Sequence, residues 1–169
     1  MSAVIKTQTP FVIKEALFEA LEEAGAEPVT VNAEVLQTER HRGGLQEEDI
    51  LTNRSDYAGR QFFRLDGEYW VLRHDSDELQ GRVSSVAKAD RKYLGVSRFL
   101  EQLSGAYRQA HERYLERLAE AERQRQEEAR KARVEKTRQQ AIAKARAQGF
   151  SVKETRSSGK IQLVLTRTV

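Results

Sequence analysis

The chain of 169 residues contains no cysteine. This absence excludes disulfides, thiolate catalysis, iron–sulfur clusters and zinc sites built on cysteine. No apolar run approaches the ~20 residues that a helix needs to cross a membrane. The first residues also lack the basic-then-apolar order of a signal peptide. We therefore expect a cytoplasmic protein that does not associate with membranes.

Proline is scarce, with two in the chain, and neither lies in the run of helix formers at 96–148. Apolar residues recur every three or four positions at the start of this run, which is the spacing of a buried helical face. They are Phe99, Leu100, Leu103, Tyr107, Ala110, Tyr114 and Leu118. From Glu120 to Lys144 the only aliphatic residues larger than alanine are Val134 and Ile142. We predict one helix of roughly 75–80 Å, at 1.5 Å per residue, whose charged part at 112–146 projects from the core.

The charged part of this helix has little to bury, so its support must come from within the helix. Ala, Glu, Gln, Lys and Arg have high helix propensity, and Glu127 and Lys131 stand four residues apart as a favourable ion pair. Pairs of this kind contribute roughly 0.2–0.5 kcal/mol each.

Charge is distributed unevenly along the chain. Residues 107–169 hold 16 Lys and Arg against 8 Asp and Glu, whereas residues 1–106 hold 13 against 18. A basic arm on an acidic body suits an anionic partner, either nucleic acid or an acidic protein face. The alternative is a solvated, Arg-rich helix whose positive charge has no partner, because Glu is interleaved throughout the arm.

The first half of the chain predicts a strand, a helix and short extended segments. The helix is expected to begin with Thr9 as N-cap and Pro10 in its first turn, and to stop at Gly25. A strand at 2–9 precedes this helix. After the helix we expect a strand at 29–31, a turn at 41–44, a strand beginning at 50–51 and a polar loop at 53–59.

The second half carries the clearest strand signal. Phe62 to Leu65 and Tyr69 to Leu72 flank an Asp-Gly dipeptide, which is typical of an antiparallel hairpin. Residues 74–92 are polar and ambiguous. The long helix is expected to have Ser97 as its N-cap and to stop at Gly149. Strands at 150–154 and 161–165, joined by a turn at 157–159, complete the order, with Ile161, Leu163 and Leu165 on one face.

These elements predict an α+β fold in the order β-α-β-β-β-α-β-β. The expectation is one antiparallel sheet of five to six strands. The first helix and the apolar start of the second helix would cover one face of this sheet. We expect residues 1–169 to form a single domain.

Several short segments carry a family resemblance. They are Ile5-Lys6-Thr7 before an amphipathic helix, the strand pair around Asp66-Gly67-Glu68-Tyr69, Phe99-Leu100 followed by Ala106-Tyr107, Gln148-Gly149-Phe150-Ser151-Val152, and the run from Gly159 to Arg167. Together they resemble the uncharacterised family of the hypothetical chloroplast open reading frame number thirty-five, a domain of unknown function that also occurs in bacteria and phages. This chain departs from the family pattern between Glu112 and Ala143, where the family's second helix is much shorter.

The resemblance implies no activity and no catalytic residues. It offers a hint of partner class, because bacterial members of the family are thought of as accessories to AAA+ ATPase systems.

Chemical motifs are sparse. The three histidines, His41, His74 and His111, have no ligand-like spacing. The stretches at 74–77 and 47–49 could supply carboxylates to a metal ion, but solvated loops are the stronger interpretation of both. Arg42-Gly43-Gly44 lacks the lysine and the strand-to-helix setting of a phosphate loop. We expect no catalytic residues, no metal site and no cofactor.

The interaction hypotheses rest on aromatic and basic residues. Aromatic residues among Phe62, Phe63, Tyr69 and Trp70 could stack on bases if one sheet face were open, although two covered faces are the stronger expectation. The helix could contact a partner through the following candidate residues: Arg123, Arg125, Arg130, Lys131, Arg133, Lys136 and Arg138.

Self-association is a further possibility. Leu100, Leu103, Tyr107, Ala110 and Tyr114 approximate a heptad repeat, but Arg125 and other charged residues occupy the later seam, which disfavours a long coiled coil. A short helical pair, or a helix docked in another subunit, stays open. The leading hypothesis is a non-catalytic interaction or assembly module that contacts a protein partner or another copy. A nucleic-acid-binding accessory protein is second, and an enzyme with unnamed residues is third.

Overall fold

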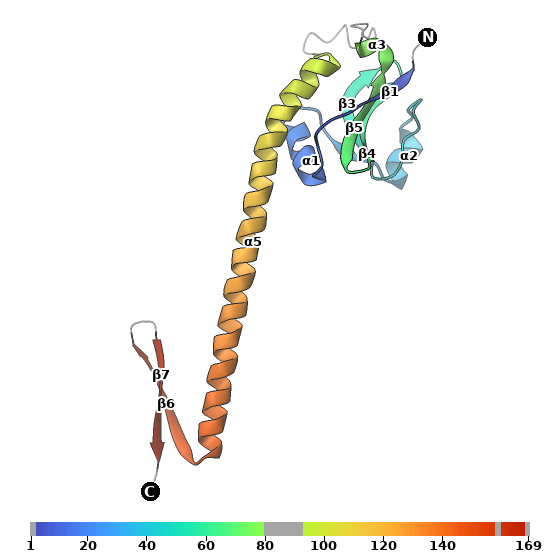
Figure 1. The fold of residues 1–169 in the computed structure, drawn as a ribbon. Helices are drawn as coiled ribbons and strands as arrows, with labels where there is room; N and C mark the ends of the chain where they lie inside the picture. Colours follow the sequence, from blue (N-terminus) through green and yellow to red (C-terminus); the bar gives the residue numbers. More distant parts are fainter. Residues whose placement is uncertain (1–2, 80–92, 158–159, 168–169) are drawn as a thin grey trace. The chain divides into compact units, whose positions relative to one another are not determined.

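The computed structural model describes residues 3–79, 93–157 and 160–167 (Figure 1). Most of the ambiguous stretch at 74–92 and the centre of the predicted turn at 157–159 lie outside these ranges. The α+β class is confirmed. The chain divides into two compact units, unit 1 at Met1–Glu116 and unit 2 at Arg117–Val169. Among the described residues, no helix has the length and apolar character that a membrane span requires.

Unit 1 is built on a five-stranded antiparallel sheet in the order β1-β5-β4-β3-β2. The strands are β1 (Val4–Thr7), β2 (Val29–Thr30), β3 (Ile50–Asp56), β4 (Gly59–Asp66) and β5 (Tyr69–Asp75). The helices in the described part of this unit are α1 (Lys14–Glu23), α2 (Ala33–Thr38), α3 (Ser76–Leu79) and the start of α5 (Val96–Ala147).

One face of the sheet carries the main core, as expected. Ile50, Phe63 and Leu72 stand opposite one another on three neighbouring strands and are fully buried. Helix α1 covers them with Ala16, Leu17, Ala20 and Leu21, and α5 adds Val96, Phe99, Leu103, Tyr107 and Ala110. Figure 1 shows α1 and the start of α5 on this face. The apolar spacing in both helices is therefore the signature of one shared core.

The opposite face of the sheet is also covered. Leu51 and Phe62 pack there with Val31, and Val35 and Leu36 of α2 lie against them. Helix α2 was absent from the sequence expectations. Its six residues are too few to show a helical period in the sequence. The residue that could have indicated it is Asn32, the N-cap, whose side chain accepts a hydrogen bond from Val35 N at 2.9 Å.

The start of α1 differs from the prediction. The helix begins at Lys14, and Thr9 is not its N-cap. The Thr9 hydroxyl donates to the carbonyl of Trp70, and Trp70 N donates to the carbonyl of Phe11 at 2.8 Å. These contacts with β5 keep the chain extended past Pro10, so a tertiary contact replaces the local cap.

The predicted loop at 53–59 is wrong, because β3 continues to Asp56 and pairs with Gly59 of β4. This polar strand is stable because its buried side chains find partners on β4. Thr52 donates to the carbonyl of Gln61 at 2.8 Å, and Arg54 Nε donates to Gln61 Oε1 at 2.9 Å. Hydrogen bonding of this kind removes most of the cost of burying polar groups.

Other sequence predictions hold. The hairpin at 62–72 forms, with Gly67 at φ 66°. Gly25 ends α1 at φ 70°, where Ala26 N bonds to the Leu21 carbonyl, and Gly149 follows α5 at φ 82°. Helix α5 begins at Val96, so Ser97 lies inside it and is not the predicted N-cap.

Unit 2 contains α5 from Arg117 onward and the strands β6 (Phe150–Ser157) and β7 (Lys160–Arg167). The two strands pair with each other in a two-stranded sheet of their own. The expectation of one sheet containing all strands is therefore wrong at the C-terminal hairpin. Isolated hairpins are marginally stable, and this hairpin faces α5 within the same unit.

We predict that Tyr107→Phe destabilises unit 1 by about 1–3 kcal/mol, because it removes a hydroxyl that accepts two backbone hydrogen bonds. Val12 N and Ile13 N, just before α1, donate to this hydroxyl, each at 3.0 Å, and the variant leaves both without this partner. Urea unfolding followed by circular dichroism measures the change. Tyr114→Phe, on the same helix, is the control and should stay near the wild-type value; equal effects of the two variants would contradict the assignment.

Candidate protein-interaction surface

The charged part of α5 is exposed along most of its length. From Leu115 to Thr137 every residue is exposed except Glu127, which is half-buried. The helix is continuous through 112–146, as predicted. Packing therefore contributes little to this segment, and its helical state depends on propensity and side-chain pairs.

The structure places four of the seven candidate cations in ion pairs. Arg123 pairs with Glu120, Arg130 and Lys131 pair with Glu127, and Arg138 pairs with Glu135 and Glu154. The predicted pair of Glu127 and Lys131 forms with 3.8 Å between Oε1 and Nζ. Hydrogen bonds from Arg123 and Arg130 hold the pKa of Glu120 and of Glu127 below the ordinary value, so both stay ionised at neutral pH.

The remaining three candidates, Arg125, Arg133 and Lys136, have no ion-pair partner among the described residues. At 3.6 residues per turn they fall within an arc of about 80° around the helix. One side of α5 therefore presents three cations that form no ion pair with a carboxylate of the described residues.

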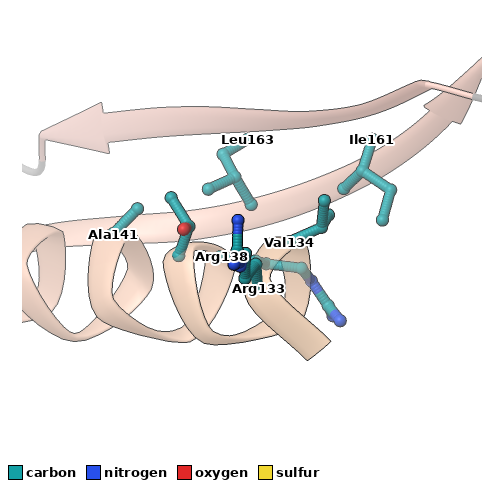
Figure 2. A pocket seen from close by; sticks show the side chains of 7 residues that line it. Arg133, Val134, Arg138, Ala141, Ile161 and Leu163 are labelled. Atoms are coloured by element: carbon teal, nitrogen blue, oxygen red, sulfur yellow. The ribbon is translucent and has the colours of Figure 1, made fainter. Parts of the chain in front are cut away.

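A groove lies between α5 and the hairpin within unit 2, and we call it the hairpin groove. Its volume is about 390 Å³. It is lined by Arg133, Val134, Thr137, Arg138, Ala141, Ile161 and Leu163. Figure 2 shows Ile161 and Leu163 pointing from the hairpin toward Val134 and Arg138 of the helix. The groove is therefore mainly apolar, with two arginines beside it.

Arg138 joins the two sides of the groove. Its Nη2 lies 2.5 Å from Glu154 Oε2 on β6, and its Nη1 lies 2.8 Å from Glu135 Oε2 one turn earlier on α5. The hydrogen bond to Glu154, followed by the one to Glu135, raises the pKa of Arg138. Arg138 is thus held by two carboxylates, whereas Arg133 at the same groove is not paired in the described part of unit 2.

The hairpin is amphipathic but leaves its apolar residues largely open. The register places Val152 opposite Leu165 and Glu154 opposite Leu163, so these residues share the face that carries the Glu154 contact with α5. Ile161 is 40% exposed, Leu165 51% and Val134 54%. Unit 2 thus exposes aliphatic side chains on both sides of its groove.

The sheet aromatics are not available for stacking on bases. Phe62 and Phe63 are fully buried, on opposite faces, and Trp70 is 4% exposed. Of the four aromatic candidates only Tyr69 is exposed. The expectation that both sheet faces are covered is confirmed.

Several of the candidate metal ligands at 74–77 and 47–49 already have partners within the protein. His74 is buried, with Nε2 2.7 Å from the Thr7 hydroxyl and Nδ1 2.9 Å from the carbonyl of Asp75. Asp49 accepts hydrogen bonds from Arg64 on both carboxylate oxygens, and Glu48 pairs with Lys14. Within the described ranges no group of three His, Asp or Glu side chains is placed to hold a metal ion.

No family model, no curated protein and no solved structure matches this chain.

Sequence reasoning found the cations but missed the apolar lining of the groove. Two signals were present. Val134 is a single aliphatic residue within a charged helix, and Ile161, Leu163 and Leu165 alternate along one strand. Each signal taken alone indicates packing inside a unit. Only the structure shows that they face each other and stay partly exposed.

We predict that Glu154→Gln loosens the hairpin on α5, because the substitution removes the carboxylate that holds Arg138. Amide hydrogen exchange in β6 and β7 should accelerate several-fold, as measured by mass spectrometry. Glu120→Gln removes an ion pair within α5 alone and serves as the control, so it should leave hairpin exchange unchanged. Unchanged exchange in Glu154→Gln would show that other contacts hold the hairpin.

We also predict that unit 1 loses stability as the pH falls below 6.5. Burial lowers the pKa of His74 and of His41 below that ordinary value, so the unfolded chain takes up protons that the folded chain resists. The stabilisation is complete above pH 6.5 and is lost toward the lower folded-state pKa. Thermal unfolding measured at several pH values should show this slope, and His74→Gln should flatten it. A slope as steep as that of the wild type in both the His74→Gln and the His41→Gln variants would assign it to other groups.

Proposed function

We propose that the protein is a non-catalytic interaction module that binds a protein partner through unit 2. The observation that carries this proposal is the hairpin groove, where aliphatic side chains of α5 and β7 stand exposed beside an arginine without a partner in the described residues. Apolar residues gathered in a groove with a polar rim are typical of protein interaction sites.

Charge supports an acidic partner. Residues 117–169 hold 14 Lys and Arg against 6 Asp and Glu. Intrahelical ion pairs engage three of these carboxylates, on Glu120, Glu127 and Glu135. Arg125, Arg133 and Lys136, which have no ion-pair partner among the described residues, are the cations proposed to meet an external partner. Complementary charge speeds encounter and selects among partners. AAA+ ATPase systems, to which the family resemblance points, are the first partner class to test, and another copy of the chain is the second.

Binding to nucleic acid is the runner-up. The same three cations on one side of α5 favour it, since lysine and arginine contact phosphates without reading sequence. Two observations weigh against it. The sheet aromatics are buried, and Glu127, Glu128 and Glu135 lie among the cations and would repel a phosphate backbone.

Site-specific photocrosslinking in cells tests the proposal. A photoreactive amino acid at Val134, beside the groove, should yield a defined adduct with one protein. The same label at Tyr57, which is exposed in unit 1, should not. Mass spectrometry identifies the adduct, and Arg133→Glu should weaken it.

Size-exclusion chromatography with light scattering, at low and moderate salt, provides the contrary test. The protein should elute apart from a short duplex and from a single-stranded oligonucleotide. A salt-sensitive complex with either, together with no protein adduct at Val134, would overturn the proposal in favour of nucleic-acid binding.

A further inference from the structure

One edge of β7 pairs with no other strand in the described part of the chain, and residues of this strand line the hairpin groove. Strand β7 pairs with β6 along Lys160–Arg167, and the two strands make up the whole of their sheet. The other edge of β7 therefore offers backbone N–H and C=O groups to a further strand. Exposed edges of this kind are sites of strand addition, in which main-chain hydrogen bonds provide affinity.

Side-chain alternation along β7 fits a strand that would lie over α5. Ile161, Leu163 and Leu165 share one face of the strand, and the first two line the groove. An added strand would turn every second side chain toward Val134 and Ala141 of the helix. Aliphatic side chains at those positions would fill the groove volume of about 390 Å³. A third strand would also stabilise a hairpin that is marginal as a pair.

The charge of unit 2 favours an acidic segment over a second copy of the chain as the source of the added strand. Unit 2 has an excess of positive charge, and Arg133 has no carboxylate partner in its described part. A second copy adding its own β7 would bring two basic units side by side, which like-charge repulsion disfavours. An acidic segment instead gains attraction from the same field.

On the basis of the proposed function, we infer that the partner contributes an extended segment in which aliphatic and acidic residues alternate. The segment adds to the free edge of β7, and its aliphatic side chains enter the hairpin groove. Its carboxylates lie on the opposite face of the added strand, where the net positive charge of unit 2 attracts them. The inference specifies both the secondary structure and the chemistry of the occupant.

The test uses the full chain and a synthetic peptide that alternates valine and glutamate over the length of β7. Fluorescence anisotropy should show binding that weakens as salt is raised. A peptide of the same composition, with valines and glutamates in separate blocks, and one that alternates valine and lysine should both bind at least about tenfold more weakly. Amide exchange in β7 should slow when the alternating peptide binds.

Two pairs of variants locate the site. Leu163→Lys places a charge in the groove and should weaken binding by at least about tenfold, whereas Gln162→Lys adds the same charge on the other face of β7 and should not. Arg133→Glu should weaken binding about threefold to tenfold, because it reverses a charge beside the groove without altering the hairpin. Arg108→Glu makes the same charge change at an exposed position of unit 1 and is its control.

The outcomes separate this inference from the proposed function. Equal binding of all three peptides would overturn strand addition. So would slower amide exchange confined to α5, together with unchanged peptide binding in Leu163→Lys. The adduct at Val134 would then still support a protein partner. A dimer of the chain in which amide exchange in β7 is slow without any peptide would assign the free edge to a second copy. That result would overturn the inference of an acidic segment. Absence of both the adduct and peptide binding would overturn both proposals.

Discussion

Unit 1 depends on one tyrosine hydroxyl that holds the chain just before helix α1. The helix begins after Ile13, which has no capping side chain. The Tyr107 hydroxyl accepts hydrogen bonds from Val12 N and Ile13 N, from a position 94 residues along the chain from Ile13. Its ring packs against Phe11, with ring centroids 4.6 Å apart. The same side chain therefore fixes where α1 starts and lays it against α5, so both helices can close one face of the sheet.

Turn residues and helix propensity correctly predicted the elements that are stabilised by interactions between residues close in sequence. The hairpin at 62–72 has an Asp-Gly turn between two β-prone runs, and α5 has high propensity and a glycine after its last turn, so both form as expected. The errors arise where distant residues compete with a local preference. Thr9 has the chemistry of an N-cap, but the carbonyl of Trp70 takes its hydroxyl. Residues 53–56 look like a loop because they are polar, and Gln61 makes that polarity compatible with a strand.

In the candidate site, too, some features could be predicted from the sequence and others could not. The cations could be read from composition, because a helix with few apolar residues must expose its charges. The intrahelical partners of Arg130 and Lys131 also follow from their spacing to Glu127. The groove could not be read, because it requires Val134 on the helix and Leu163 on a strand that the chain brings back after Gly149. The free edge of β7 could not be predicted for a related reason, because the local sequence indicates a strand but not the strands with which it pairs.

The basic side of α5 and the apolar hairpin groove together constrain the proposed partner more than either property does alone. A basic helix without a groove would accept any polyanion, including a phosphate backbone, because charge by itself does not read shape. An apolar groove without charge would accept any aliphatic surface, including another copy of the chain. Here Arg138 pairs with Glu135 and Glu154, while Arg133 beside the same groove has no carboxylate partner among the described residues. A segment that supplies both an aliphatic row and carboxylates satisfies the groove and the charge together. Nucleic acid lacks the aliphatic row, and a second unit 2 has too few carboxylates.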